Sequence, residues 1–176
     1  MTPKILLTSF DTWLPHHKSN ASDDLLELIS QHPNFNDAIF LRKLPVDFQL
    51  APIQLIAKIQ QTKPDIVVCC GMAESRTKLT VESQATKEKK VLLTNINLEK
   101  LVIELPFTEI SHEAGKFVCE ALYYSALNEL QKHPSTACTF IHVPVLTKQN
   151  TGPILADFLT LLQRLKLFYK PQQNYS

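Results

Sequence analysis

The chain has 176 residues, of which 44% are hydrophobic and 20% charged, so it is long enough for one domain with a substantial core. Its 18 basic and 17 acidic side chains nearly cancel, and no run of Lys or Arg forms a basic stripe, so we expect no nucleic-acid partner. No apolar stretch reaches membrane-spanning length, and the first residues lack a signal-peptide pattern. We therefore expect a cytoplasmic protein with no membrane partner.

Hydrophobic periodicity and turn residues predict strands that alternate with helices. In chain order we expect a strand at 5–10, a helix at 23–31 capped by Ser22, a strand at 38–41, a helix at 50–61, strands at 66–71, 78–84, 91–93 and 107–110, a helix of about four turns after Gly115, a strand at 138–143 and a helix at 151–168. Residues 98–104 fit either type.

The alternation predicts a single-domain α/β fold, a three-layer sandwich with a mostly parallel central sheet and helices on both faces. We expect this domain to span residues 1–169 and the tail at 170–176 to fray. The positions of the cysteines do not suggest a disulfide bond. Cys69 and Cys70 are neighbours in one expected strand, and no two cysteines have metal-ligand spacing. We therefore expect no disulfide framework, no metal site and no cofactor.

Cys119 is the first candidate for chemistry, because it lies about one turn into the helix that follows Gly115. Unpaired backbone N–H groups and the helix dipole favour a negative charge at that end of a helix. A thiol placed there is partly ionised, and the thiolate is the nucleophilic form. The alternative is that Cys119 packs as a small buried hydrophobe, which is what most free cysteines do.

His142 and Glu82 are candidates for the base and its orienting group. His142 ends an apolar strand that is stopped by Pro144, and the carboxyl ends of parallel strands face the ligand crevice of open α/β sheets. A hydrogen-bonded structural histidine fits that position equally well. Glu82 lies on the face opposite Leu79 and Val81, so it is buried if the sheet is covered on both sides. The alternative is a strand whose polar face is exposed to solvent, and strand alternation alone favours it.

Two short segments carry a family resemblance. Residues 114–119 read Ala-Gly-Lys-Phe-Val-Cys, and residues 140–144 read Phe-Ile-His-Val-Pro. Together with residues 5–13, 20–22, 44–48, 64–76 and 81–82, they resemble the pyroglutamyl peptidase I (pyrrolidone-carboxylate peptidase) family of cysteine peptidases. The resemblance covers roughly residues 4–165. Glu82, Cys119 and His142 match the family's catalytic residues in order and in place.

The resemblance implies a cysteine omega-peptidase that removes N-terminal pyroglutamate from peptides. Cys119 would attack the carbonyl, His142 would transfer the proton, and Glu82 would hold the imidazole. By the same resemblance, the substrate contacts would come from Phe10, Trp13, Asn20, Gly71, Met72, Arg76 and Val143. The N–H of Cys119 and Arg76 would stabilise the oxyanion. The alternatives are core packing for Phe10 and Trp13 and a surface ion pair for Arg76. The family's subunit contacts also allow a homo-oligomer.

The chain departs from the family around the expected pocket. Leu14 and Pro15 replace paired glycines, Met72, Glu74 and Ser75 replace a glutamine and two glycines, and Ser83 replaces an arginine. The segment 83–118 is also shorter, and in the family this region covers the pocket. We therefore expect an open pocket and weak activity, because an open site excludes less water. The alternative function is a catalytically degenerate homologue that binds a small ligand or partner without turnover.

Overall fold

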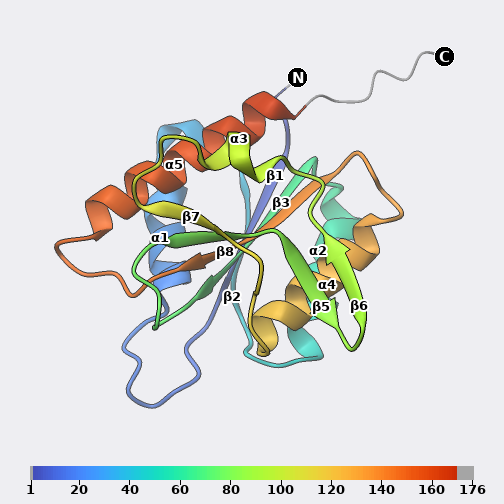
Figure 1. Cartoon of the computed structure of the whole chain (residues 1–176), viewed down its shortest axis with the longest axis horizontal. Coiled ribbons are helices and arrows are strands. Elements are labelled where there is room, and N and C mark those ends of the chain that lie inside the picture. Colours follow the sequence, from blue (N-terminus) through green and yellow to red (C-terminus); the bar gives the residue numbers. More distant parts are fainter. Residues whose placement is uncertain (1, 170–176) are drawn as a thin grey trace.

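A computed structural model describes residues 2–169 and contains a six-stranded sheet with the order β2-β1-β3-β8-β4-β7 (Figure 1). Its strands are β1 (Ile5–Phe10), β2 (Ile39–Leu44), β3 (Ile66–Met72), β4 (Leu79–Glu82), β7 (Thr108–Ser111) and β8 (Ala137–Val143). Every neighbouring pair is parallel except β4 and β8, which run antiparallel. The predicted single-domain α/β fold with a mostly parallel sheet is therefore confirmed.

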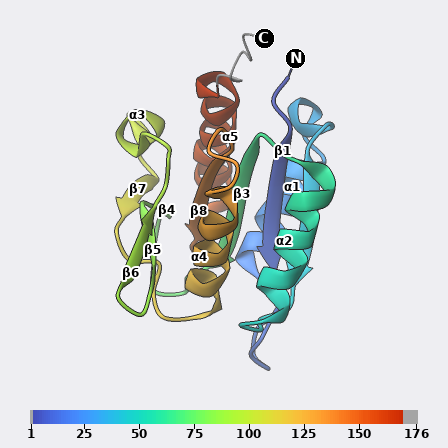
Figure 2. The same cartoon turned by 90° about the vertical axis from the view of Figure 1, so that its right-hand side faces the viewer.

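Helices cover the sheet on both faces, and Figure 2 looks onto one of these faces, with the strands side by side. The helices are α1 (Ala21–Ser30), α2 (Leu50–Thr62), α3 (Leu98–Val102), α4 (Val118–Leu130) and α5 (Thr151–Phe168). Helices α1, α3 and α5 pack on one face of the sheet, against residues such as Leu7 and Val68. Helices α2 and α4 pack on the other face, against residues such as Leu6 and Phe140. Strand residues alternate between the two cores because successive side chains point to opposite faces.

Burial on both faces explains the continuous apolar runs of the central strands. All six residues of β1 are buried, and so are the first six of β3. The last six residues of β8 are buried as well, including the polar Thr139 and His142. The parallel strands β3 and β8 pair in register, with Gly71 opposite His142. A glycine without a side chain and a histidine therefore lie next to each other at the carboxyl ends of β3 and β8.

Some element boundaries differ from the predicted ones. Asn20, not Ser22, caps α1, and its side chain accepts a hydrogen bond from the Ser22 N–H. Helix α4 begins at Val118, so Cys119 is its second residue and not one turn inside it. The hairpin of β5 (Gln84–Lys87) and β6 (Lys90–Leu93) contributes Ala85 and Leu92 to the core beside α4.

The ambiguous segment 98–104 forms the short helix α3, which begins after Asn97 because the Asn97 side chain accepts a hydrogen bond from the Lys100 N–H. The expected frayed tail at 170–176 lies outside the described residues. Within residues 2–169, no helix is both long enough and apolar enough to cross a bilayer.

Candidate active site

Glu82 and His142 form a buried pair on the sheet face that α4 covers. His142 Nδ1 lies 2.7 Å from Glu82 Oε1, and the two side chains are 6% and 0% exposed. Thr80 lies opposite His142 in the antiparallel pairing of β4 with β8, and Thr80 is 2% exposed. The alternative of a solvent-facing polar strand is therefore wrong for Thr80 and Glu82. Helix α4 lies against this part of β4, because the hydroxyl of Tyr123 in α4 reaches the Glu82 carbonyl at 3.0 Å.

Arg76 binds the same oxygen of the Glu82 carboxylate as His142 does. Its Nη1 donates to Glu82 Oε1 at 2.7 Å, and its Nη2 donates to the Glu113 carbonyl at 2.9 Å. Arg76 also contacts the Thr80 hydroxyl. One carboxylate oxygen is thus shared by the imidazole and the guanidinium, which is a charge-assisted arrangement. The other oxygen, Oε2, is buried and has no hydrogen-bond partner within residues 2–169.

Cys119 lies on the same face, at the N-terminus of α4. A Cβ atom added to Gly71 would be only 2.7 Å from Cys119 Sγ, so the sulfur sits directly above the backbone of β3. Because Gly71 pairs with His142, this contact brings the thiol to the strand position beside the imidazole. Within the described chain, no hydrogen bond joins the Cys119 thiol to His142; the imidazole is instead bound through Nδ1 to Glu82.

Tyr123 fixes α4 relative to β4. Its hydroxyl donates to the Glu82 carbonyl at 3.0 Å from a completely buried position. Tyr123 is four residues after Cys119, so both side chains lie on the same face of the helix. The hydrogen bond therefore sets the position of the helix N-terminus, and with it the Cys119 thiol, against the strand that carries Glu82.

The protonation of Cys119 differs from the sequence-based expectation. Burial raises the pKa of the Cys119 thiol to about 12, and the negative charge of Glu82 adds to this rise. A backbone N–H and the positive charge of Arg76 act in the opposite direction. Cys119 is only 8% exposed, so the desolvation of its thiolate outweighs the effect of the helix N-terminus. The thiol is therefore not ionised in advance and needs a base to remove its proton.

A small cavity of about 90 Å³ opens beside these groups. Cys119 and His142 both line it, as do Phe10, Trp13, Asn20 and Met72 from the predicted set. The lining also includes Val46, Ala114, Phe117 and Val118, which the sequence did not single out. The walls are mostly apolar, with one thiol, one imidazole and one amide, and this composition is typical of a small-ligand site.

Three residues of the predicted set lie elsewhere. Gly71 is beneath the sulfur and does not line the cavity. Val143 is fully buried, and its carbonyl accepts a hydrogen bond from the Ala73 N–H at 2.9 Å. Arg76 points to Glu82. Its partner is thus a buried carboxylate, and the alternative of a surface ion pair is wrong. Phe10 belongs to the core and lines the cavity as well.

Asn20 uses its amide to shape the cavity wall. Its Nδ2 donates to the Asp11 carbonyl at 3.0 Å, while its Oδ1 accepts from Ser22 at the start of α1. One N–H of the amide remains for a ligand. Asn20 therefore ties the loop after β1 to the helix that follows it.

Thr80 and Tyr123 belong to the site and were missed. Strand alternation could have predicted that Thr80 lies beside Glu82, because residues two apart in a strand share one face of the sheet. Helical spacing could have placed Tyr123 on the same face of the helix as Cys119. A hydroxyl on that buried face needs a hydrogen-bond partner.

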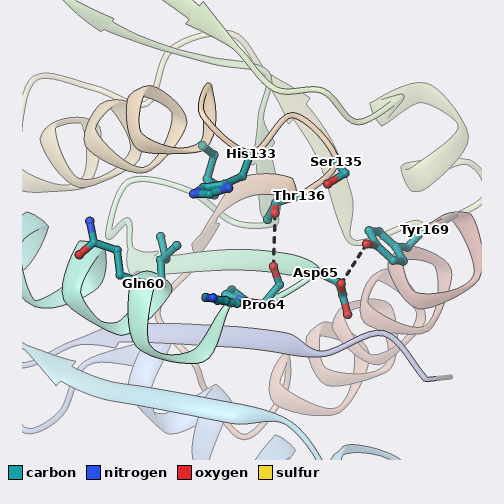
Figure 3. A pocket seen from close by; sticks show the side chains of 10 residues that line it. Gln60, Pro64, Asp65, His133, Ser135, Thr136 and Tyr169 are labelled. Carbon is teal, nitrogen blue, oxygen red and sulfur yellow. Dashed lines mark hydrogen bonds between the residues drawn. The ribbon is translucent and has the colours of Figure 1, made fainter. Parts of the chain in front are cut away.

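A larger cavity, of about 520 Å³, lies at the opposite end of the sheet (Figure 3). Pro64 and Asp65 precede β3 there, and Thr136 precedes β8, so this cavity is at the amino ends of the strands. The Tyr169 hydroxyl donates to Asp65 across it at 2.9 Å. None of the predicted site residues lines it, so the smaller cavity is the candidate active site.

Alkylation should distinguish Cys119 from the other three cysteines. Cys69, Cys70 and Cys138 are at most 1% exposed, and burial raises the pKa of each thiol. We expect iodoacetamide to label Cys119 first, because Cys119 lines the candidate active-site cavity and the other three cysteines do not. The rate should rise about tenfold per pH unit from pH 6 to 9, since the thiolate fraction grows by that factor below the pKa. Site-resolved mass spectrometry measures both; a rate that is already constant at pH 7 would contradict the raised pKa.

Comparisons with known proteins point to one family. The family model described as pyroglutamyl peptidase matches residues 3–108 and 102–157. The pyrrolidone-carboxylate peptidase of Alkaliphilus oremlandii (strain OhILAs) is 29% identical over an alignment of 177 positions that includes 85% of this chain and 82% of the relative. The crystal structure of the pyroglutamyl peptidase I from Bacillus amyloliquefaciens has a TM-score of 0.82 at 21% identity, covering 97% of this chain and 98% of that one.

The structure of the pyrrolidone carboxyl peptidase from Thermococcus litoralis gives a TM-score of 0.77 at 19% identity, over 94% of this chain and 96% of that one. At such identities the structural likeness establishes the fold. The family-model matches extend over most of the sequence. The chain therefore belongs to the pyroglutamyl peptidase family of cysteine peptidases.

Proposed function

We propose that this chain is a cysteine omega-peptidase that removes N-terminal pyroglutamate from peptides, with Cys119 as nucleophile, His142 as general base and acid, and Glu82 as the group that orients the imidazole. The observation that carries the proposal is the buried Glu82–His142 pair beside a cavity that Cys119 also lines. The named relatives support the substrate class. No observation favours the alternative of a degenerate binding protein.

The chemistry begins with proton transfer. Because Nδ1 of His142 is engaged by Glu82, Nε2 is the nitrogen that takes the proton from the Cys119 thiol. The sulfur then attacks the pyroglutamyl carbonyl carbon, and the carbonyl oxygen gains the negative charge. Collapse of this intermediate expels the peptide amine, which takes the proton from His142. Water, deprotonated by His142, hydrolyses the thioester and restores the thiol.

The backbone N–H of Cys119 is the better-supported oxyanion donor. It lies in the first turn of α4, where N–H groups have no partner within the helix. Arg76 donates to Glu82 and to the Glu113 carbonyl, so we assign it to positioning the carboxylate and not to the oxyanion.

The cavity suits a small neutral ring. Phe10 and Trp13 provide apolar walls and Asn20 provides a polar edge, which matches a flat lactam with one carbonyl and one N–H. Met72 remains a predicted substrate contact, because it lines the cavity, and its sulfur accepts a hydrogen bond from the Ala21 N–H at 3.3 Å. Gly71 and Val143, the other two predicted contacts, do not line the cavity.

Hydrolysis of a fluorogenic pyroglutamyl amide tests the proposal. Wild type should release the fluorophore, and Cys119→Ala should not. The matched control is Cys138→Ala, which removes a buried thiol from the same face of the sheet without touching the cavity. Equal activity in wild type and Cys119→Ala would reject the assignment of the nucleophile. Binding of the substrate by wild type without turnover would favour the degenerate homologue.

Trp13→Ala should raise KM about tenfold and change kcat less, because Trp13 lines the cavity beside Phe117 and a buried aromatic contact contributes on the order of 1.5–3 kcal/mol. Michaelis–Menten curves on the same amide measure the change. Phe168→Ala is the control, because Phe168 is half exposed on α5, in the other layer. An unchanged KM in Trp13→Ala would remove Trp13 from the substrate site. The weak activity expected for an open pocket stays a prediction of the same assay.

A cytoplasmic location and a homo-oligomer are part of the proposal as well. Fractionation of cells and sedimentation of the purified protein test them.

A further inference from the structure

Three side chains that the proposed peptidase mechanism does not use converge beside the pocket. His17 Nε2 lies 2.9 Å from Glu74 Oε1, and His16 Nε2 lies 3.7 Å from the same oxygen. The candidate ligand atoms of the three residues are all within 4.8 Å of one another. In a tetrahedral zinc site with bonds of about 2.0–2.1 Å, ligand atoms are separated by about 3.3 Å. The cluster therefore has nearly the dimensions of a three-ligand metal site before any ion is bound.

Two tight turns bring these residues together. The His17 N–H donates to the Leu14 carbonyl at 3.0 Å, and Pro15 occupies the second position of this turn, as is common. The turn places the rings of His16 and His17 side by side, with centroids 4.4 Å apart. The Arg76 N–H donates to the Ala73 carbonyl at 3.1 Å, and Glu74 projects from that second turn. Neighbouring histidines, which point apart in a strand, thus face one carboxylate.

His17 is the observation that distinguishes this cluster from an ordinary surface ion pair. Its side chain is only 5% exposed, whereas those of His16 and Glu74 are 67% and 47% exposed. The ring is held edge-on by Trp13, with centroids 4.4 Å apart. His17 Nδ1 is buried and has no hydrogen-bond partner within residues 2–169. A buried imidazole is thus fixed in place while the other two ligands remain open to an ion from solvent.

We propose that His16, His17 and Glu74 bind a divalent transition-metal ion of the Zn²⁺ class, with the fourth position open. Two imidazoles and one carboxylate suit Zn²⁺ and Co²⁺ and are poor ligands for Ca²⁺ or Mg²⁺, which prefer oxygen. The ion would join the loop after β1 to the turn after β3. Trp13 in that loop and Met72, the last residue of β3, both line the pocket, and the turn carries Arg76, the partner of Glu82.

Trp13 makes the site measurable, because it is the single tryptophan of the chain and contacts His17. We would titrate Co²⁺ into the Cys119→Ala variant, in which no active-site thiol can bind metal. Co²⁺ should quench Trp13 fluorescence with one equivalent bound, and Zn²⁺ in excess should restore it. The cobalt spectrum should show a tetrahedral d–d band without a thiolate charge-transfer band, since the ligands are nitrogen and oxygen.

His16→Gln and Glu74→Gln, both at exposed positions, should each weaken Co²⁺ binding at least tenfold, and His133→Gln, an exposed histidine on the far side, should leave it unchanged. Quenching that is equally strong in His16→Gln and Glu74→Gln would overturn the site. Binding that wild type shows and Cys119→Ala lacks would do so too, because the ion would then sit at the Cys119–His142 pair. The readouts are spectroscopic, so a failure of the proposed peptidase activity would not affect them.

Discussion

Glu82→Gln should lower kcat on a pyroglutamyl amide by about 10²–10⁴-fold, the range typical of disrupted acid–base catalysis. Glu82 Oε1 accepts hydrogen bonds from both His142 and Arg76, so the substitution removes the charge that stabilises the imidazolium. It also leaves Arg76, whose side chain is 24% exposed, without a carboxylate. KM should change little, because Glu82 does not line the cavity.

The control for this substitution is Glu109→Gln. Glu109 lies on the neighbouring strand, opposite Thr80, and its side chain is exposed, so the same chemical change should leave kcat and KM unaltered. Thermal unfolding of both variants separates catalysis from folding. A folded Glu82→Gln enzyme with wild-type kcat would show that a Cys–His dyad is sufficient.

Arg76→Gln provides an intermediate case. Arg76 touches Glu82 and not the cavity, so we expect a smaller loss of kcat than for Glu82→Gln. If Arg76 acts only through Glu82, the double variant should be no worse than Glu82→Gln alone, because coupled residues do not add.

The sequence predicted the fold well because most of its signals are local. The apolar runs of β1, β3 and β8 and the amphipathic helices appear at or within a few residues of the predicted positions. The family resemblance predicted that Glu82, Cys119 and His142 act together as catalytic residues. From strand alternation alone, Glu82 read as solvent-facing, because alternation reports that one face is polar but not whether a helix covers that face.

Three features of the site could not be read from the sequence, because each depends on contacts between distant segments. Burial of the Cys119 thiol by the packing of α4 on β3 and β8 outweighs the helix N-terminus that the sequence revealed. Arg76 reaches Glu82 only because the turn after β3 lies beside β4. In the cluster of His16, His17 and Glu74, His17 and Glu74 are 57 positions apart in the sequence. No short spacing motif therefore indicates that these residues meet.

Gly71→Ala should reduce activity by at least about 10²-fold and destabilise the protein by about 1–3 kcal/mol. Its Cβ would be 2.7 Å from Cys119 Sγ and 2.9 Å from Phe140 Cζ, both closer than van der Waals contact. Neither neighbour can move freely. Phe140 is fully buried between Tyr123 and His142, with ring centroids 5.8 and 4.8 Å away, and the Cys119 side chain is short. The sulfur must therefore shift relative to the imidazole.

Gly152→Ala is the matched control for Gly71→Ala. A Cβ at Gly152 meets no atom within 4 Å, and this residue lies inside α5, where alanine is favoured over glycine by about 0.5–1 kcal/mol. The control should therefore keep full activity and unfold at an equal or higher temperature. A double-mutant cycle identifies the contact, since Gly71→Ala should destabilise the Cys119→Ala background less than it destabilises wild type. Full activity and an unchanged unfolding temperature in Gly71→Ala would show that Cys119 Sγ does not rest on β3, and the geometry proposed for the nucleophile would then be wrong.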